Sequence, residues 1–298
     1  MFVDNFDDLL KAIKLNIHKI YITKDIEVKQ DLKLTSNNVK IIGVINTNNS
    51  NKLPVLNFTN FNANGILITG NNYVLKNLII QNSKDCGLRI KNNAFNNTVI
   101  NCIFRYNQNS GLSITKGSYN NLIINCISYR NCDYNNFGKS ADGFSCKLQA
   151  GPLNKFINCF SFENSDDGFD NYDNPNDVYY INCYAFDNGY PNFFFNDDFY
   201  INNFKGNGNG FKLGSIDISP YRYIKNCTAF NNKLKGFDQN NSSCTIDLLN
   251  NNSFDNLINY KLDNCTLQIN INNIENFNQS IVNYCNLIKF NCMNNFIY

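Results

Sequence analysis

Glycine returns at a regular interval along this chain, and an apolar residue follows it each time. The steps between these glycines are 22 to 26 residues, with two longer exceptions. They are Gly65, Gly87, Gly111, Gly143, Gly168, Gly210 and Gly236. A repeat of this length is typical of a solenoid, in which identical backbone units stack on one another. It therefore predicts which residues, although distant in sequence, are neighbours in space.

A second periodic feature is a cysteine that follows asparagine in successive units, at Cys102, Cys126, Cys159, Cys183 and Cys227. The spacing from glycine to the next cysteine stays at 15 to 17 residues, whereas the spacing from cysteine to glycine is 9, 17, 9, 27 and 9. The two long spacings indicate insertions of 8 and 18 residues at one place in the repeat. Insertions in a solenoid gather on one face, which is often the binding face.

The segments between these markers are short runs of Val, Ile, Phe and Tyr bounded by Gly and Asn, a pattern that predicts strands. We therefore predict an all-β fold, a right-handed parallel β-helix (solenoid) with coils about 4.8 Å apart. A further asparagine follows each periodic cysteine by five residues, at Asn107, Asn131, Asn164, Asn188 and Asn232. We expect these to form a buried ladder at a turn with left-handed backbone, since an amide both donates and accepts.

A single β-helix domain is expected over residues 1–298, because neither a linker nor a change in composition divides the chain. The segment Asn5–Lys14 is amphipathic with acids in its first turn, which predicts a capping helix inside an N-terminal cap at about residues 1–25. The repeat weakens beyond about residue 245, so degenerate coils and a C-terminal cap are expected over about 245–298.

Charge and hydropathy argue against two classes of partner. The formal net charge is +2 with acids and bases interspersed, so no basic surface for nucleic acid is expected. No apolar run reaches the length that spans a membrane. The first residues lack the basic and apolar regions of a signal peptide, so such a signal is expected to be absent or already removed.

Cysteine and histidine usage excludes several kinds of chemistry. The twelve cysteines include no Cys-x-x-Cys pair, and five of them form one inward column of small apolar residues, so mostly free thiols are expected. The other seven, including Cys86, Cys132 and Cys146, leave room for one or two disulfides. His18 is the only histidine, which argues against nucleophile and histidine pairs and against histidine metal centres.

Alignment of the units on glycine brings acidic residues together. The residues immediately before the glycines are Asn64, Cys86, Ser110, Asp142, Asp167, Asn209 and Lys235. The residues two positions after them are Leu67, Arg89, Ser113, Ser145, Asp170, Lys212 and Asp238. Side chains alternate along a strand, so the second set is expected on the outer face, together with the residues two positions away. Because Asp166 adjoins Asp167, four carboxylates are expected to converge beside Lys212.

Carboxylates stacked at the spacing of successive coils repel one another unless a cation neutralises them. A site of oxygen ligands without histidine or cysteine favours a hard cation, and an irregular arrangement favours Ca²⁺ over Mg²⁺. A lysine beside such an ion is a candidate general base. Two simpler interpretations remain, a turn made by Asp166 and Asp167 or a calcium ion with a structural role.

Four segments together resemble the pectate lyases of polysaccharide lyase family 9, and they are Lys139–Leu148, Asn164–Asp170, Gly206–Gly214 and Gly236–Asn241. The resemblance covers about residues 60 to 260. It implies a secreted, calcium-dependent lyase that cleaves polygalacturonate by β-elimination. It also implies that Asp142, Asp166, Asp167 and Asp170 bind Ca²⁺ and that Lys212 is the catalytic base. Phe169 stands where the family commonly has tryptophan.

Other functions are also compatible with these residues. Related lyases act on rhamnogalacturonan or other polyuronates, an inverting glycoside hydrolase would use the aspartates as acid and base, and a binding β-helix would need no catalysis. The expected partner is an acidic polysaccharide such as pectin, bound by a monomer. Lys147 on the outer face is a candidate for binding a further substrate carboxylate. The aromatic insertion Tyr190–Phe195 is expected to pack on the coils rather than line a cleft.

Overall fold

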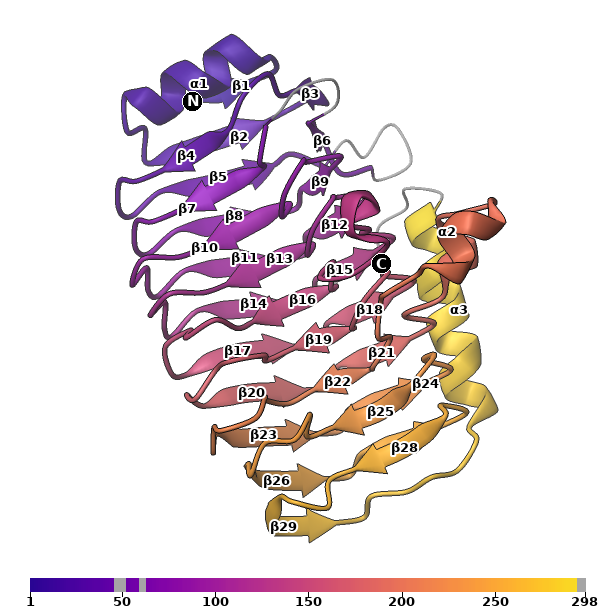
Figure 1. The fold of residues 1–298 in the computed structure, drawn as a ribbon. Helices are drawn as coiled ribbons and strands as arrows, with labels where there is room; N and C mark the ends of the chain where they lie inside the picture. Colours follow the sequence, from indigo (N-terminus) through magenta and orange to yellow (C-terminus); the bar gives the residue numbers. More distant parts are fainter. Residues whose placement is uncertain (46–51, 59–62, 294–298) are drawn as a thin grey trace.

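Each coil of the chain contributes one short strand to each of three parallel sheets, which stack into an elongated β-helix (Figure 1). The structure is a computed structural model that describes residues 1–45, 52–58 and 63–293. Every strand pair in the described part of the chain is parallel, and each strand pairs with the corresponding strand of the next coil. The predicted parallel β-helix is therefore confirmed.

The sheets are named A, B and C. Sheet A has eleven strands: β1 (Phe2–Val3), β2 (Lys19–Ile22), β5 (Lys40–Gly43), β8 (Val74–Lys76), β11 (Thr98–Ile100), β14 (Leu122–Ile124), β17 (Asn154–Ile157), β20 (Val178–Ile181), β23 (Tyr221–Lys225), β26 (Thr245–Leu249) and β29 (Thr266–Ile271). Sheet B has nine: β3 (Ile26–Glu27), β6 (Val55–Asn57), β9 (Ile79–Gln81), β12 (Ile103–Arg105), β15 (Ile127–Tyr129), β18 (Phe160–Phe162), β21 (Tyr184–Phe186), β24 (Thr228–Phe230) and β27 (Asn252–Phe254). Sheet C has nine: β4 (Leu32–Leu34), β7 (Ile66–Ile68), β10 (Leu88–Ile90), β13 (Leu112–Ile114), β16 (Phe144–Cys146), β19 (Phe169–Asp170), β22 (Phe211–Lys212), β25 (Lys235–Asp238) and β28 (Ile258–Lys261).

The core contains columns of like residues from successive coils. The apolar residues that follow the periodic glycines stack inside sheet C, where the ring of Phe169 lies 5.3 Å from that of Phe144 and 4.7 Å from that of Phe211. These rings are fully buried. Stacked aromatic pairs add about 0.5–1.5 kcal/mol each to the stabilisation from burial. The strands that carry the outer aspartates and lysine thus rest on a rigid aromatic column.

The predicted ladder of buried asparagines is confirmed. The side-chain amide of Asn131 donates to the Oδ1 of Asn164 at 2.8 Å and accepts from the amide of Asn107 at 2.9 Å. The expectation of left-handed backbone in this ladder was wrong, because positive φ angles occur instead at the asparagines that precede the cysteines, such as Asn125 at 51°. Those asparagines form a second, exposed ladder, in which Asn125 donates to Asn101.

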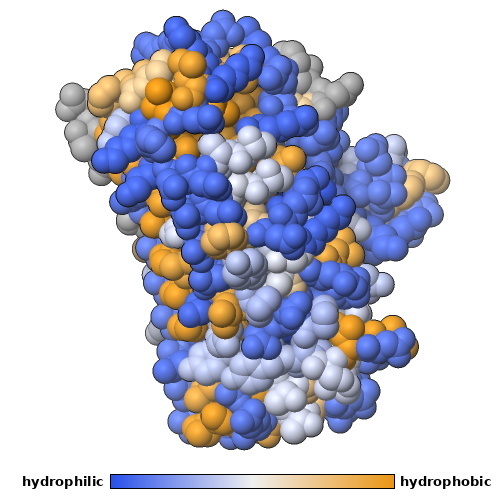
Figure 2. Space-filling model, turned by 90° about the vertical axis from the view of Figure 1, so that its left-hand side faces the viewer, coloured by the Kyte–Doolittle hydropathy of each residue, from blue (hydrophilic) through white to orange (hydrophobic). Residues whose placement is uncertain are grey.

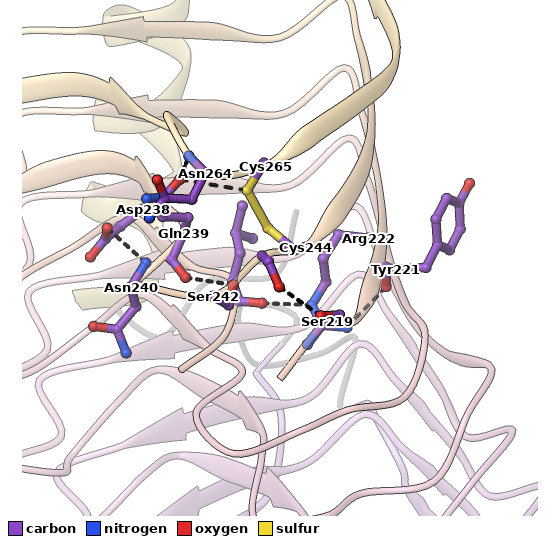
Figure 3. Close-up of a disulfide and its surroundings, with 12 residues drawn as sticks. Ser219, Tyr221, Arg222, Asp238, Gln239, Asn240, Ser242, Cys244, Asn264 and Cys265 are labelled. Carbon is purple, nitrogen blue, oxygen red and sulfur yellow. Dashed lines mark hydrogen bonds between the residues drawn. A yellow bond between two sulfur atoms is a disulfide. The ribbon is translucent and has the colours of Figure 1, made fainter. Parts of the chain in front are cut away.

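The five periodic cysteines are buried and free, as predicted. A disulfide joins two of the others, Cys244 and Cys265, which lie on consecutive coils of sheet A immediately before β26 and β29 (Figure 3). This bridge agrees with the expectation that the seven other cysteines leave room for one or two disulfides. The Cα atoms of Cys244 and Cys265 are 4.8 Å apart, which lies within the range that a disulfide spans.

Helix α1 (Phe6–Lys14) lies over the first coil, as predicted, with Asn5 as its N-cap. The Asn5 side chain accepts a hydrogen bond from the backbone N–H of Asp8, and Phe6, Leu9 and Ala12 are buried against the first strands. This apolar face closes the open end of the solenoid core. A solenoid needs such capping because its terminal coil has no neighbour.

The C-terminal part of the described chain is arranged differently. Strand pairing continues through β29, most of whose residues are exposed, and α3 (Gln279–Met293) then runs back along sheet B (Figure 1). Tyr284 contacts the rings of Phe160 and Tyr184, and Cys285 and Ile288 are buried on the same face. Helix α3 therefore covers the apolar outer face of sheet B and not the last coil.

On the side of the molecule shown in Figure 2, hydrophilic residues form most of the surface and hydrophobic residues lie scattered among them. Within the described ranges, no helix combines the length and the hydropathy that crossing a membrane requires. The outer face of sheet C is likewise polar, and it is on this face that the predicted acidic column lies.

Replacement of Asn131 by alanine is expected to lower the free energy of unfolding by about 2–4 kcal/mol, because it leaves the buried backbone and side-chain N–H groups of Asn107 without their acceptor and removes the side-chain donor to the Oδ1 of Asn164. The matched control is Asn125→Gly, since glycine adopts left-handed backbone without strain and the lost amide is exposed; it should change stability by less than about 0.5 kcal/mol. Urea unfolding measures both. Equal losses would show that burial of the ladder adds nothing.

Candidate active site

Three consecutive strands of sheet C, β16, β19 and β22, hold the predicted site. Their register pairs Ser145 with Asp170 and Asp170 with Lys212, and Lys212 then pairs with Asp238 of β25. The order predicted from the glycine alignment is therefore confirmed. Because successive strands are about 4.8 Å apart, these side chains leave the sheet as one row.

Asp142, Asp166 and Asp167 form a compact buried cluster beside that row. One carboxylate oxygen of each lies within 4.8 Å of those of the other two. All three side chains are at least 95% buried. Asp170 is also buried, but the structure connects it to the other aspartates through lysine ammonium groups rather than placing it in the same compact set.

Two lysines bridge the carboxylates. The Nζ of Lys147 lies 2.6 Å from the Oδ2 of Asp142 and 2.9 Å from the Oδ2 of Asp170. The Nζ of Lys212 lies 3.1 Å from the Oδ2 of Asp167 and 3.7 Å from the Oδ1 of Asp170. Lys147 was expected as a contact for a further substrate carboxylate, and in the structure its ammonium group lies between Asp142 and Asp170.

Backbone groups from both insertions orient Asp166. Its Oδ2 accepts a hydrogen bond from the N–H of Ser140 at 2.7 Å, and its Oδ1 accepts one from the N–H of Asn207 at 2.7 Å. The first insertion spans residues 133–140 and ends at Ser140, and the second spans residues 190–207 and ends at Asn207. The sequence did not reveal these contacts, because backbone donors in irregular segments leave no residue pattern.

Asn209 is a further site residue that sequence analysis did not single out, although it occupies the column before glycine. Its backbone and side-chain N–H groups donate to the Oδ1 of Asp167 at 2.9 and 2.8 Å. Its own Oδ1 is buried without a hydrogen-bond partner among the described residues. The column position next to Asp167 was the signal that could have identified it.

Burial and charge shift the pKa values of the site in different directions. Burial raises the pKa of Asp142 well above its usual range despite the charge of Lys147, and it raises the pKa of Asp167 to about 7 against the charge of Lys212. Burial also acts to raise the pKa of Asp170, but the two lysines outweigh it and lower that pKa. Burial acts to lower the pKa values of Lys147 and Lys212, but the neighbouring carboxylates outweigh burial and raise both pKa values. In this arrangement Lys212 is a protonated amine.

The residues fit a hard cation such as Ca²⁺. Three buried carboxylates supply oxygen ligands within a few ångströms of one another, and among the described residues neither histidine nor cysteine adds a nitrogen or sulfur ligand. Beside Asp167, the buried Oδ1 of Asn209 has no hydrogen-bond partner in the part of the chain that the structure describes. A cation would also offset the mutual repulsion of the carboxylates, which the lysines offset in part.

The acidic cluster opens into a cleft of about 610 Å³ on the face of sheet C. Two acids, Asp166 and Asp170, line the cleft. The basic residues that line it are Arg89, Lys91, Lys116, Lys139, Lys147 and Lys212. The excess of cations makes the cleft attractive to a polyanion.

The two insertions pack against each other beside this cleft. The second insertion contains a 3₁₀ turn, η2 (Pro191–Phe193), and the short helix α2 (Asp198–Asn202). The first insertion contains the 3₁₀ turn η1 (Tyr134–Asn136). Its Tyr134 contacts Phe195 of the second insertion, and its Phe137 contacts Phe199 of the second insertion. The aromatic insertion therefore packs, as expected, but chiefly on the other insertion rather than on the coils.

Comparison with known proteins agrees with this geometry. The model of the family described as "Pel9A-like, right handed beta helix region" matches residues 10–276. Pectate lyase L of Dickeya dadantii (strain 3937) is 40% identical over 196 residues, or 66% of this chain and 39% of that protein. Pectate lyase L of Paenibacillus polymyxa (strain SC2) is 36% identical over 207 residues, or 65% of this chain and 39% of that protein. The chain thus spans 39% of the length of these curated relatives.

Solved structures show the same fold. The crystal structure of pectate lyase Pel9A has a TM-score of 0.69 and 30% identity, and the match covers 87% of this chain and 70% of that one. A rhamnogalacturonan lyase is similar in fold, with a TM-score of 0.62, 23% identity and coverage of 79% and 66%. Because the family match covers most of this chain, the chain belongs to the Pel9A-like, right-handed β-helix family, as its glycine motifs predict.

Proposed function

We propose that the protein is a calcium-dependent pectate lyase, which cleaves polygalacturonate by β-elimination and leaves 4,5-unsaturated oligogalacturonates. The observation that carries this proposal is the position of Lys212 at the edge of the acidic cluster. Lys212 is in register with Asp170, and its Nζ lies 3.1 Å from the Oδ2 of Asp167. The similarity to proteins named pectate lyase supports the same reaction.

In this proposal Asp142, Asp166, Asp167 and Asp170 hold the calcium ion and Lys212 is the catalytic base. Calcium would supply positive charge that binds a substrate carboxylate and acidifies the proton on the adjacent carbon. The hydrogen bonds from Ser140 and Asn207 keep Asp166 oriented. A carboxylate held in this way loses little conformational entropy when it binds a ligand.

The proposed reaction is a proton abstraction. The Nζ of Lys212 takes the proton from C5 of a galacturonate residue, the electron pair forms the C4–C5 double bond, and the C4–O bond breaks. The departing oxygen takes up a proton from water. Lys212 must begin as a neutral amine, yet Asp167 and Asp170 raise its pKa in the described arrangement. Base function therefore requires that the charge of these carboxylates be compensated.

The cations of the cleft indicate an anionic polymer as the substrate. Arg89 lies on the same column as Lys212, four strands earlier in sheet C, which corresponds to roughly 19 Å. Lys91 and Lys116 line the same part of the cleft. A chain of uronate residues would place carboxylates along this row. We propose that Lys147 also contacts a substrate carboxylate, from its position between Asp142 and Asp170.

The geometry argues against the inverting hydrolase considered above. Such enzymes separate their two carboxyl groups by about 6.5–9.5 Å to admit water, whereas carboxylate oxygens of Asp142, Asp166 and Asp167 lie within 4.8 Å of one another. We also propose a monomer, since the stacking of β16, β19 and β22 by itself brings the four aspartates and Lys212 together. Because polymeric pectin does not cross membranes, we also propose that the enzyme acts outside the cell.

The assay that tests the function is ultraviolet absorbance on polygalacturonate, since a lyase creates a conjugated C4–C5 double bond, a hydrolase makes only reducing ends and a binding protein makes neither. Chelation should abolish turnover and lower the thermal midpoint, because the buried carboxylates then repel one another. Ca²⁺ should restore both, and Mg²⁺ should restore them poorly. Full turnover in excess chelator would contradict the calcium assignment.

Asp170→Asn should weaken calcium binding by at least the roughly 10–100-fold seen when even outer partners of a metal site are removed. Asp238→Asn is the matched control, because Asp238 is buried on the same column but lies outside the acidic cluster. Its Oδ2 pairs with the Nζ of Lys235 at 3.0 Å. Asp238→Asn should change calcium affinity little. Calorimetric titration of both variants measures the difference, and equal losses would refute the assignment of Asp170.

Lys212→Arg should reduce kcat by about 10²–10⁴-fold, because arginine keeps the positive charge but does not deprotonate in the working range. Calcium and polygalacturonate binding should persist, so binding measured by calorimetry shows that the variant is intact. The control Lys235→Arg alters a lysine of the next strand, β25, which pairs with Asp238, and it should keep turnover. Substantial lyase activity in Lys212→Arg would mean that another residue is the base, and Lys147 would be tested next.

A further inference from the structure

Arg222 is an arginine in the core of the β-helix. It is the second residue of β23, and its side chain is fully buried. In the register of sheet A it stands between Val178 of β20 and Ile246 of β26. An aliphatic residue therefore fills this column on both neighbouring coils, and packing alone does not require an arginine here.

Within the described part of the chain, the guanidinium group of Arg222 donates hydrogen bonds to backbone carbonyls only. Its Nε donates to the carbonyl of Leu213 at 2.9 Å and its Nη2 to that of Asn174 at 2.8 Å. Its Nη1 donates to the carbonyls of Asn176 at 2.6 Å and of Tyr221 at 2.9 Å. Among the described residues, no carboxylate forms an ion pair with it. Figure 3 shows Arg222 with Tyr221 near the coils that the disulfide joins.

Three of these carbonyls, all except that of Tyr221, belong to the turns that leave two proposed catalytic strands. Leu213 directly follows Lys212, and Asn174 and Asn176 lie in the turn after Asp170. The side chain of Asn174 in turn donates to the carbonyl of Cys146, the residue before Lys147. Arg222 thus connects directly to the ends of β19 and β22, and through Asn174 to the end of β16.

Burial of an arginine without an acidic partner is costly, and here four charge-assisted hydrogen bonds offset the cost. Burial lowers the pKa of Arg222 to about 10, so the group remains charged at neutral pH. The planar guanidinium holds its donors in a fixed fork, which a flexible lysine does not reproduce. The turns after β19 and β22 are therefore held in one relative position by a single rigid group.

We propose that Arg222 is a positioning residue for the reaction, which sets the relative placement of Lys212 and Asp170 by clamping the turns that follow them. The expected effect on kcat rests on the proposed lyase function, whereas the expected effect on the placement of the turns rests on the hydrogen bonds alone. Misplacement of a catalytic group by about 1 Å costs on the order of 10²-fold in rate. Loss of the clamp should therefore reduce kcat more than it raises KM.

The test compares Arg222→Met and Arg222→Lys with Arg105→Met. Arg105 is a second buried arginine, on β12 of sheet B, and donates to Gln81 at 2.8 Å and Tyr129 at 3.0 Å, away from the cleft. Arg222→Met should lower kcat about 10–100-fold with KM changed less than about threefold. Arg222→Lys should recover part of the rate, and Arg105→Met should keep kcat within about twofold at a similar loss of thermal midpoint.

Amide hydrogen exchange of residues 171–176 and 211–214 gives a readout that does not depend on activity. Both segments should lose protection in Arg222→Met and keep it in Arg105→Met. Unchanged protection, or a kcat within twofold of wild type at a comparable loss of thermal midpoint, overturns the proposal. If the wild-type protein shows no lyase activity, the proposed function is wrong. The hydrogen-exchange data then still test whether Arg222 holds the two turns in place. If Arg222→Met does not fold, Arg222→Lys is judged by the same criteria.

Discussion

The stacking of like residues on parallel coils is the constraint on which the rest of this structure depends. A parallel β-helix places equivalent side chains about 4.8 Å apart, so each column must consist of groups that tolerate their own kind at that distance. Amides satisfy this condition because they donate and accept along the column, as Asn131 and Asn164 do. Flat rings also satisfy it, as Phe169 and Phe211 do at 4.7 Å.

Charged groups do not satisfy this condition, and the cleft on sheet C is where the chain departs from it. Asp142 and Asp167 stand on consecutive coils and are fully buried, and burial raises the pKa of both. Lys147 and Lys212 supply part of the missing charge. Like charges held together in this way store repulsion, which a bound cation relieves. The regular stacking that stabilises the core therefore also places these carboxylates close together without full compensation of their charge.

Irregular segments complete what the repeat begins. The insertions before Gly143 and Gly210 pack on each other through aromatic contacts such as Tyr134 with Phe195. Each also ends in a backbone N–H that holds Asp166. Inside the coil, Arg222 connects the turns after β19 and β22. The row of side chains on sheet C is thus supported from the insertions at its margin and from the core beneath it.

The sequence by itself determined the fold class, the register of sheet C and the set of residues that converge beside Lys212, because a periodic chain converts spacing into spatial neighbourhood. It did not determine contacts that leave no periodic trace. The backbone donors to Asp166, the Cys244–Cys265 disulfide and the bridging position of Lys147 depend on how irregular segments and flexible side chains settle. The path of α3 along sheet B was decided by an apolar outer face that spans many coils. Tertiary structure decided these features because each joins groups whose separation in sequence follows no common period.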